Sequence, residues 1–158
     1  MSRRHPGLVP VARDHVHALS VAARLRRGPR CGQDKWPSDP AEQAARLQRF
    51  LEHDLRPHFA VEEALVFPLA RQHLTGAAAL VALLVAEHRA LERMILALID
   101  TVPDASTLAA IGTLLEAHVR REDRTLFPRM EAEVPAAALS ALEPALAAWR
   151  APAADRRR

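Results

Sequence analysis

Two segments of eleven residues share one pattern of histidine, glutamate, phenylalanine and proline. The first runs from His58 to Pro68 and the second from His118 to Pro128. In each, a glutamate follows the histidine by four positions, another acid comes directly after it, and Phe-Pro closes the segment. Residues four apart lie one turn apart on the same face of a helix. Each segment therefore places an imidazole beside a carboxylate, and two facing copies offer nitrogen and oxygen ligands that suit a transition metal.

The histidines divide into two groups according to the apolar periodicity around them. Four of the eight lie in an apolar stripe, one in each predicted long helix: His15, His58, His88 and His118. Asp14 and Glu87 directly precede two of them, so the chain reads as a two-helix motif used twice. A single inward histidine is most often a core residue satisfied by a neighbour. Four inward histidines together with Glu62 and Glu122 would carry a large desolvation penalty, which a metal offsets better than hydrogen bonds among the groups do.

Four amphipathic helices are needed to position these residues. Periodicity and helix-end signals predict them over about 10–27, 40–73, 77–101 and 105–131. Short connections between the last three helices, and a longer first loop, predict an all-α, antiparallel up-down four-helix bundle. A short Ala-rich helix is expected from Pro135 to about Trp149, packed across the bundle. The expected domain division is a bundle over 1–134, followed by this helix and a basic, disordered tail over 135–158.

Several local features of these helices can be predicted. Asp39 and Asp104 are expected N-caps, and Gly28-Pro29 is expected to end the first helix. Pro57 and Pro68 each remove a backbone hydrogen bond, so the second helix is expected to be kinked. The inward stripes are expected to include Leu65, Leu69 and Leu80, and Trp36 is expected to pack on the end of the bundle.

Composition narrows the class of protein. A chain of 158 residues fits one domain, and a small net charge of +3 does not predict nucleic-acid binding. Cys31 is the only cysteine, which excludes an internal disulfide and favours a reducing cytoplasm. No segment approaches the ~20 apolar residues of a membrane span, and no signal peptide is recognised. We therefore expect a cytoplasmic protein that binds neither nucleic acid nor membrane.

The duplicated His-x-x-x-Glu segments with their trailing Phe-Pro resemble the hemerythrin-like, HHE-type cation-binding family, over about residues 8–131. The resemblance implies a bundle that holds two non-haem irons, bridged by two carboxylates and an oxo or hydroxo group. It implies four terminal imidazole ligands and two bridging glutamates: His15, His58, His88, His118, Glu62 and Glu122. Zinc or manganese are the alternative metals.

The chain departs from the oxygen-carrying hemerythrins on its third and fourth helices. Those proteins have His-x-x-x-His on the third helix, where this chain has Glu92 in place of the second histidine. They have His-x-x-x-x-Asp on the fourth helix, where this chain offers Glu122 at +4 and Asp123 at +5. We favour Glu122 because its phase is inward and it copies Glu62. Glu92 remains open, either as an extra ligand or as a surface acid beside Arg89.

Three further side chains near the motif are weaker ligand candidates. Glu63 and Asp123 follow the two motif glutamates, and we expect them to lie outside the metal's direct ligands or on the surface. His17 lies two positions after His15 and is the less favoured of the two histidines on the first helix.

Fewer nitrogen ligands would lower the reduction potential of iron and leave coordination positions open. The functional prediction is a di-iron protein that binds or senses oxygen or a related small ligand, such as nitric oxide or peroxide. The alternatives are an enzyme that reduces peroxide or nitric oxide at the same centre, and an iron-handling or regulatory bundle. The sequence does not separate binding from catalysis, and it marks neither a protein partner nor an oligomer interface.

Overall fold

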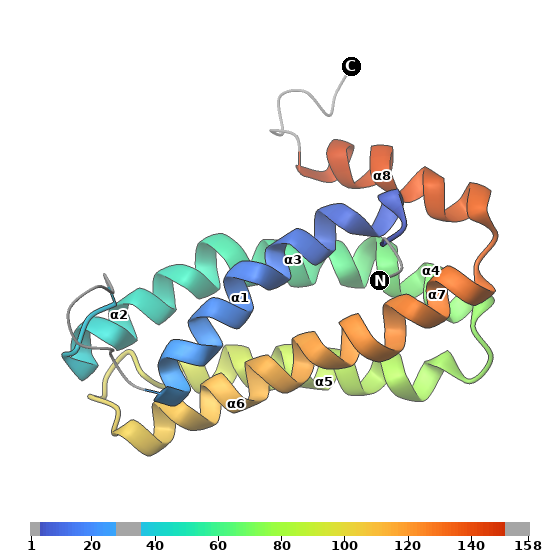
Figure 1. Cartoon of the computed structure of the whole chain (residues 1–158). Helices are drawn as coiled ribbons and strands as arrows, with labels where there is room; N and C mark the ends of the chain where they lie inside the picture. Colours follow the sequence, from blue (N-terminus) through green and yellow to red (C-terminus); the bar gives the residue numbers. More distant parts are fainter. Residues whose placement is uncertain (1–3, 28–35, 151–158) are drawn as a thin grey trace.

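The protein is a bundle of long helices in the computed structural model, which describes residues 4–27 and 36–150. Four helical rods run alternately up and down along one axis, and a shorter helix lies over the side of the bundle near one end (Figure 1). The first rod is α1 (Val9–Arg27) and the third is α5 (Ala77–Leu96). No strand occurs in the described part of the chain. The predicted all-α bundle with a short C-terminal helix is confirmed.

The second and fourth rods are continuous helices interrupted by π-turns. The second comprises α2 (Pro40–Phe50), α3 (Arg56–Val61) and α4 (Phe67–His73), joined by π-turns at Leu51–Leu55 and Glu62–Val66. The fourth comprises α6 (Ala105–Arg121) and α7 (Phe127–Glu133), joined by a π-turn at Glu122–Leu126. The two motif segments therefore share the same irregularity at the same position, directly after their His-x-x-x spacing.

The π-turns accommodate the prolines that follow them. Pro57, Pro68 and Pro128 each lie in the first turn of the α-helical segment after a π-turn. The N–H of Phe67 donates to the carbonyl of Glu62, and that of Phe127 donates to the carbonyl of Glu122. These bonds span five residues instead of four, which widens the helix where proline cannot donate. The irregularity predicted at the two prolines of the second rod takes this form, and the helix continues through both.

The extra residue in each π-turn rotates the inward face of the helix that follows. Leu65 and Leu69, which were expected inward, are only half-buried. Val66, Phe67 and Ala70 are buried in their place, at 0–1% exposure. Both leucines still pack against the core, so the prediction is partly right, but the most deeply buried positions are displaced because the π-turn breaks the constant period of 3.6 residues. Leu80 of α5 is likewise half-buried, and its neighbour Val81 is buried instead.

The helix ends agree with local capping chemistry. Asp39 accepts a hydrogen bond from the N–H of Glu42 at 2.9 Å, and Asp104 accepts one from the N–H of Thr107 at 2.7 Å, so both predicted N-caps are confirmed. The third helix was predicted to reach residue 101, but α5 ends at Leu96. The N–H groups of residues 98 and 99 bond to carbonyls three residues back, which tightens the chain into turns.

Trp36 packs on the bundle as expected, with 5% of its surface exposed. The guanidinium of Arg46 lies 5.0 Å from the centre of its ring. Three sequence-based expectations fall outside the described residues: the helix stop at Gly28-Pro29, the lone Cys31 and the tail after Arg150. No helix in the described part is both long and apolar enough to cross a membrane.

α8 (Ala136–Arg150) covers the N-terminal end of α1 (Figure 1). It buries Leu139, Leu142 and Leu146 against the bundle. The approach is close at Gly7, where an added Cβ would lie 1.9 Å from the carbonyl oxygen of Leu139. The C-terminal helix therefore packs across the bundle, as predicted, and meets the turn that precedes α1.

The apolar core forms two clusters, one toward each end of the bundle. On α1, Val11 belongs to one cluster and Ala18 to the other, and His15 lies between them. On α5, Leu84 and Leu91 flank His88 in the same way. The buried histidines and glutamates thus form a polar layer across the middle of the bundle, closed by hydrocarbon above and below.

Candidate metal centre

The polar layer brings together all six side chains that the sequence singled out. They come from all four rods, and none is more than 7% exposed: His15, His58, Glu62, His88, His118 and Glu122. Their ligand atoms form two overlapping groups, each with its atoms within 4.8 Å of one another. One group contains His15 and His58, the other contains His88 and His118, and both contain Glu62 and Glu122. The two glutamates are therefore shared.

Glu62 has the geometry of a bridging carboxylate. Its Oε1 lies 3.1 Å from Nε2 of His58 and 3.8 Å from Nε2 of His15. Its Oε2 lies 3.3 Å from Nε2 of His88. Glu122 also faces both groups, because its Oε2 lies 3.2 Å from Nε2 of His15 and 3.6 Å from Nε2 of His118. Each carboxylate thus lies between two pairs of histidines.

Each histidine is oriented by an acid on a neighbouring rod. The Nδ1 atom of every inward histidine lies 2.9–3.0 Å from a carboxylate oxygen, in four pairs: His15 with Asp123, His58 with Asp14, His88 with Glu63 and His118 with Glu87. Such carboxylates fix the ring plane and the tautomer of a metal-binding histidine and raise its basicity. Glu63 and Asp123, which were expected to lie outside the direct ligands, belong to this outer set.

Four arginines in turn contact the four outer acids. The pairs are Arg150 with Asp14, Arg89 with Glu63, Arg121 with Glu87, and Arg4 with Asp123. The arginines offset the negative charge of the acids and hold their carboxylates in place. Each inward histidine is therefore the innermost member of a chain of imidazole, carboxylate and guanidinium.

Phenylalanine rings stack on two of the four imidazoles. Phe127 stacks on His15 at 5.5 Å between ring centres, and Phe67 stacks on His88 at 5.6 Å. These are the phenylalanines of the two Phe-Pro pairs, so the π-turn that buries them also brings them onto the histidines. Phe59 also stacks on His88, at 3.8 Å between ring centres. The rings hold the imidazole planes and exclude water from the layer.

The unsatisfied polar atoms of this layer fit a bound cation. Because each Nδ1 faces a carboxylate acceptor, the proton of a neutral ring belongs on Nδ1, and Nε2 presents a lone pair. Nε2 of His88 and Nε2 of His118 lie 3.2 Å apart, an arrangement that two lone pairs would not favour without a cation between them. Both oxygens of Glu62 and of Glu122 lack a hydrogen-bond partner among the described residues. Ligands about 2.1 Å from an octahedral ion are about 3 Å apart, so the observed spacings suit a metal.

Without a metal, the layer must hold protons. Burial alone would lower the pKa of His15, but contacts with Asp123, Glu122 and Glu62 outweigh it and raise that pKa to about 11. The charge of Glu62 similarly overcomes burial and raises the pKa of His58 to about 9. Burial and the charge of Glu62 raise the pKa of Glu122. Burial opposes ionisation of Glu62, but the surrounding histidines hold its pKa well below the usual value. A metal would replace these protons as the balancing positive charge.

A family model of the hemerythrin HHE cation binding domain matches residues 10–141. This chain belongs to that family. The match covers most of the bundle, all six inward polar side chains and the beginning of α8. No curated protein and no solved structure matches the chain significantly.

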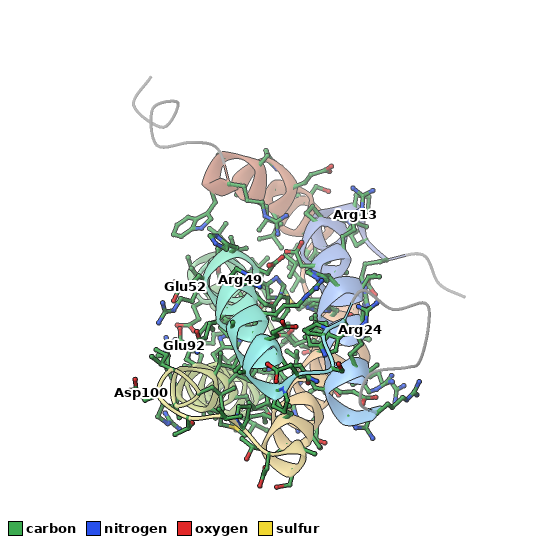
Figure 2. The ribbon with its side chains drawn as sticks, turned by 90° about the vertical axis from the view of Figure 1, so that its left-hand side faces the viewer. Arg13, Arg24, Arg49, Glu52, Glu92 and Asp100 are labelled. Carbon is green, nitrogen blue, oxygen red and sulfur yellow. The ribbon has the colours of Figure 1, made fainter. Side chains whose placement is uncertain are left out.

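Glu92 lies outside the centre of this hemerythrin-like domain. Its carboxylate is 3.4 Å from Arg89 and 3.4 Å from Arg56, and Figure 2 shows it on the outer side of the bundle. It belongs to neither group of potential metal ligands. His17 is also outside, since it is exposed and contacts Asp54 at 3.2 Å. The structure thus places both among surface ion pairs.

Sequence reasoning missed the roles of two acids in this hemerythrin-like site. Asp14 and Glu87 were noticed only as acids that precede inward histidines, yet each orients a histidine on the next rod. A signal for this was present, because a residue one position before a core residue points toward one of the flanking helices. The contacts of Arg4 and Arg150 had no such signal, since they depend on where the chain's end segments fold.

Proposed function

We propose that this hemerythrin-like domain holds two iron ions and binds oxygen or a related small ligand. The observation that carries the proposal is the pair of overlapping ligand groups that share Glu62 and Glu122. His15 and His58 would hold one ion, His88 and His118 would hold the other, and the shared glutamates would bridge them. Bundles with glutamates and histidines on facing helices are a known framework for such carboxylate-bridged pairs.

The donor set favours iron over zinc. It consists of imidazole and carboxylate without a thiolate, a mixture that suits iron, manganese and zinc. Each group supplies four side chains, which would close a tetrahedral zinc site completely. A six-coordinate iron would keep positions open for a small ligand. The resemblance to di-iron hemerythrins points in the same direction.

The bound iron would supply open coordination positions and a reversible change of oxidation state. The protein's residues would hold the ligands in place and exclude water from the centre. The outer acids keep each Nε2 directed at the centre, and the stacked rings of Phe67, Phe127 and Phe59 keep water away. The uniform spacing of the four histidine–acid pairs favours a centre that is organised before its metals arrive, which supports binding as a principal function.

The experiment is an anaerobic iron(II)-loaded sample whose optical spectrum is followed as oxygen is admitted and then removed. We expect new charge-transfer bands on exposure to oxygen. An unchanged spectrum, in a sample whose iron content has been verified, would contradict the proposal.

Peroxide distinguishes binding from the enzymatic alternative. A single stoichiometric oxidation of the iron-loaded protein agrees with a binding or sensing role. Sustained turnover of peroxide would replace that role with an enzyme of peroxide reduction, and the same comparison can be made with nitric oxide. Glu92→Gln is a suitable control in both experiments. Glu92 carries the same kind of carboxylate as Glu62 and Glu122, but it lies among surface arginines.

A further inference from the structure

A cavity of about 640 Å³ opens beside the polar layer. It lies between α1, α3 and α6, with the C-terminal end of α8 at its mouth. Its wall includes His58 and His118, which come from different ligand groups. His58 is 7% exposed, whereas none of the other five inward polar side chains exceeds 1%. The cavity therefore borders the most exposed of the six side chains of the candidate metal centre.

The volume of this cavity exceeds what a diatomic ligand needs. A water molecule occupies about 30 Å³ of liquid, and oxygen or nitric oxide is of similar size. Pockets of about 300–1,000 Å³ are typical for small organic molecules. A cavity of about 640 Å³ thus has room for an organic ligand next to the centre.

Apart from His58 and His118, the buried part of the cavity wall is apolar. It is formed by Ala18, Leu55, Phe59, Val61, Leu115 and Val119, each of which is buried. Trp149 adds a large apolar side chain at the mouth and is 40% exposed. A ligand that fills this space would need an apolar body of several carbons.

The rim of the cavity carries two arginines and two aspartates, and one of these arginines has no ion-pair partner among the described residues. Its two acids are already engaged, since Asp14 contacts Arg150 and Asp54 contacts His17. Arg13 and His53 also line the cavity, are exposed, and have no ion-pair partner within 4–27 and 36–150. Figure 2 shows Arg13 on the part of α1 nearest α8, with Arg24 further along the same helix. The rim thus offers a guanidinium and an imidazole to a negatively charged group.

We propose that this cavity binds a small organic carboxylate, with its apolar body directed toward Phe59 and its carboxylate at Arg13 and His53. The guanidinium suits a carboxylate because it donates parallel hydrogen bonds as well as charge. The apolar body would displace water from the hydrocarbon wall and end beside His58 and His118. This inference goes beyond the proposed function, because it concerns a second ligand in a cavity lined mainly by side chains other than the candidate metal ligands.

Calorimetric titration of the full chain, as purified with its metal, tests the proposal with three probes. Octanoate has both the body and the charge, octylammonium has the same body with the opposite charge, and acetate has the charge without the body. We expect octanoate to bind at least tenfold more tightly than either of the others. Equal binding of octanoate and octylammonium, or no binding of octanoate, would overturn the proposal.

Two substitutions locate the carboxylate. Arg13→Gln should weaken octanoate binding about tenfold, consistent with the loss of one charge-assisted contact. Arg71→Gln is the matched control, because Arg71 is exposed on α4, has no ion pair with any described residue, and does not line the cavity. Equal loss in both variants would mean a general charge effect and would overturn the assigned position.

The orientation of the ligand has an independent readout. In the iron-loaded protein, the methyl-end protons of octanoate should relax faster than those beside the carboxylate, because the paramagnetic centre lies at the inner end. The reverse order would overturn the orientation. Metal content measured on the same sample separates this outcome from a failure of the di-iron proposal, since calorimetric binding of octanoate is expected whichever metal is present.

Discussion

The carboxylate of Asp14 lies 3.0 Å from Nδ1 of His58, on a neighbouring rod, although Asp14 directly precedes His15 in the sequence. The other half of the bundle repeats this relationship, with Glu87 before His88 and 3.0 Å from Nδ1 of His118. Each acid-His pair therefore contributes its histidine as one candidate metal ligand. Its acid orients the other histidine of the same ligand group. The repeated motif is a unit of two helices that is completed only by packing.

Removal of the acid that orients His58 should weaken metal binding. Asp14→Ala leaves Nδ1 of that ring without its acceptor, and loss of such an outer partner typically costs about 10–100-fold in metal affinity. Competition with a chromophoric chelator measures the change. Asp54→Ala is the matched control, because among the described residues Asp54 pairs only with the exposed His17. Parent-like affinity in Asp14→Ala would show that the outer acid does not orient the ligand.

The two proposed metal positions should differ in how readily they release metal. The acids that orient His15 and His58 are contacted by Arg4 and Arg150, which lie near the two ends of the described chain. The acids of the other group are contacted by arginines on or beside the bundle rods themselves. End segments open more easily than the middle of a bundle. We expect a chelator to remove the metals in two stages, the His15–His58 position first.

Substitution of one arginine at a time tests this order. Arg150→Gln should accelerate the first stage severalfold and leave the second unchanged, because it frees the carboxylate of Asp14. Arg121→Gln should instead accelerate the second stage, because Arg121 contacts Glu87. Stopped-flow absorbance with excess chelator resolves the stages. Release in one stage, or acceleration of the slow stage by Arg150→Gln, would contradict the assignment.

The metal-free protein should lose stability as the pH rises above neutrality. The pKa values of His15 and His58 are raised to about 11 and about 9, so both rings hold protons in the folded chain that they lose at about 6.5 when unfolded. The stabilisation from these protons is complete below about pH 6.5 and is lost as the pH rises through 9 to 11. Melting curves between pH 7 and 10 should show a falling midpoint.

The metal-loaded protein is the control for this pH effect. Metal binding requires the same nitrogens to be deprotonated, so the loaded chain should keep its melting midpoint over that range. Metal uptake at pH 7 should also release protons, which a weakly buffered solution with an indicator dye detects. Identical pH profiles for the metal-free and the loaded protein would contradict the charge assignment of the layer.

Close packing of α1 on α6 should depend on Gly112. A Cβ at this position would lie 2.7 Å from the carbonyl oxygen of Ala22 and 2.9 Å from Cβ of Leu25. Gly112→Ala should therefore destabilise the protein by about 1–3 kcal/mol through overpacking, although alanine is the better helix former. Thr113→Ala, on the adjacent exposed position of α6, is the matched control and should not destabilise. Higher stability of Gly112→Ala in a denaturant titration would show that the helices can separate freely.

The rods and the inward polar side chains were predictable because they follow from periodicity alone. Histidine or glutamate at a stripe position is conspicuous wherever the neighbouring stripe positions are leucine, as around His88 and His118. Counting succeeded up to Glu62 and Glu122, including across the π-turn at Leu51–Leu55. Counting was less accurate just beyond Glu62, because the π-turn there adds one residue to the turn. Nothing in the composition of Glu62–Val66 indicates a π-turn.

The remaining differences between prediction and structure concern contacts between side chains on different rods. The sequence left Glu92 open because its spacing from His88 fits a ligand, but the proximity of Arg56, from the second rod, could not be read from the chain. To predict the pairing of Asp14 with His58, one would have needed to know how the two helices are rotated relative to each other. Such contacts depend on packing between rods, whereas the stripe depends only on the period within one rod.

The central claim is that Glu62 and Glu122 bridge two iron ions, and metal analysis of the purified chain tests it most directly. Protein from iron-replete expression should contain two irons per chain, one for each ligand group. Glu62→Gln and Glu122→Gln should each lose both, because each glutamate belongs to both groups, whereas Glu92→Gln should retain both. A folded, metal-free parent chain, or a parent whose iron is unaffected by either glutamate substitution, would contradict the account.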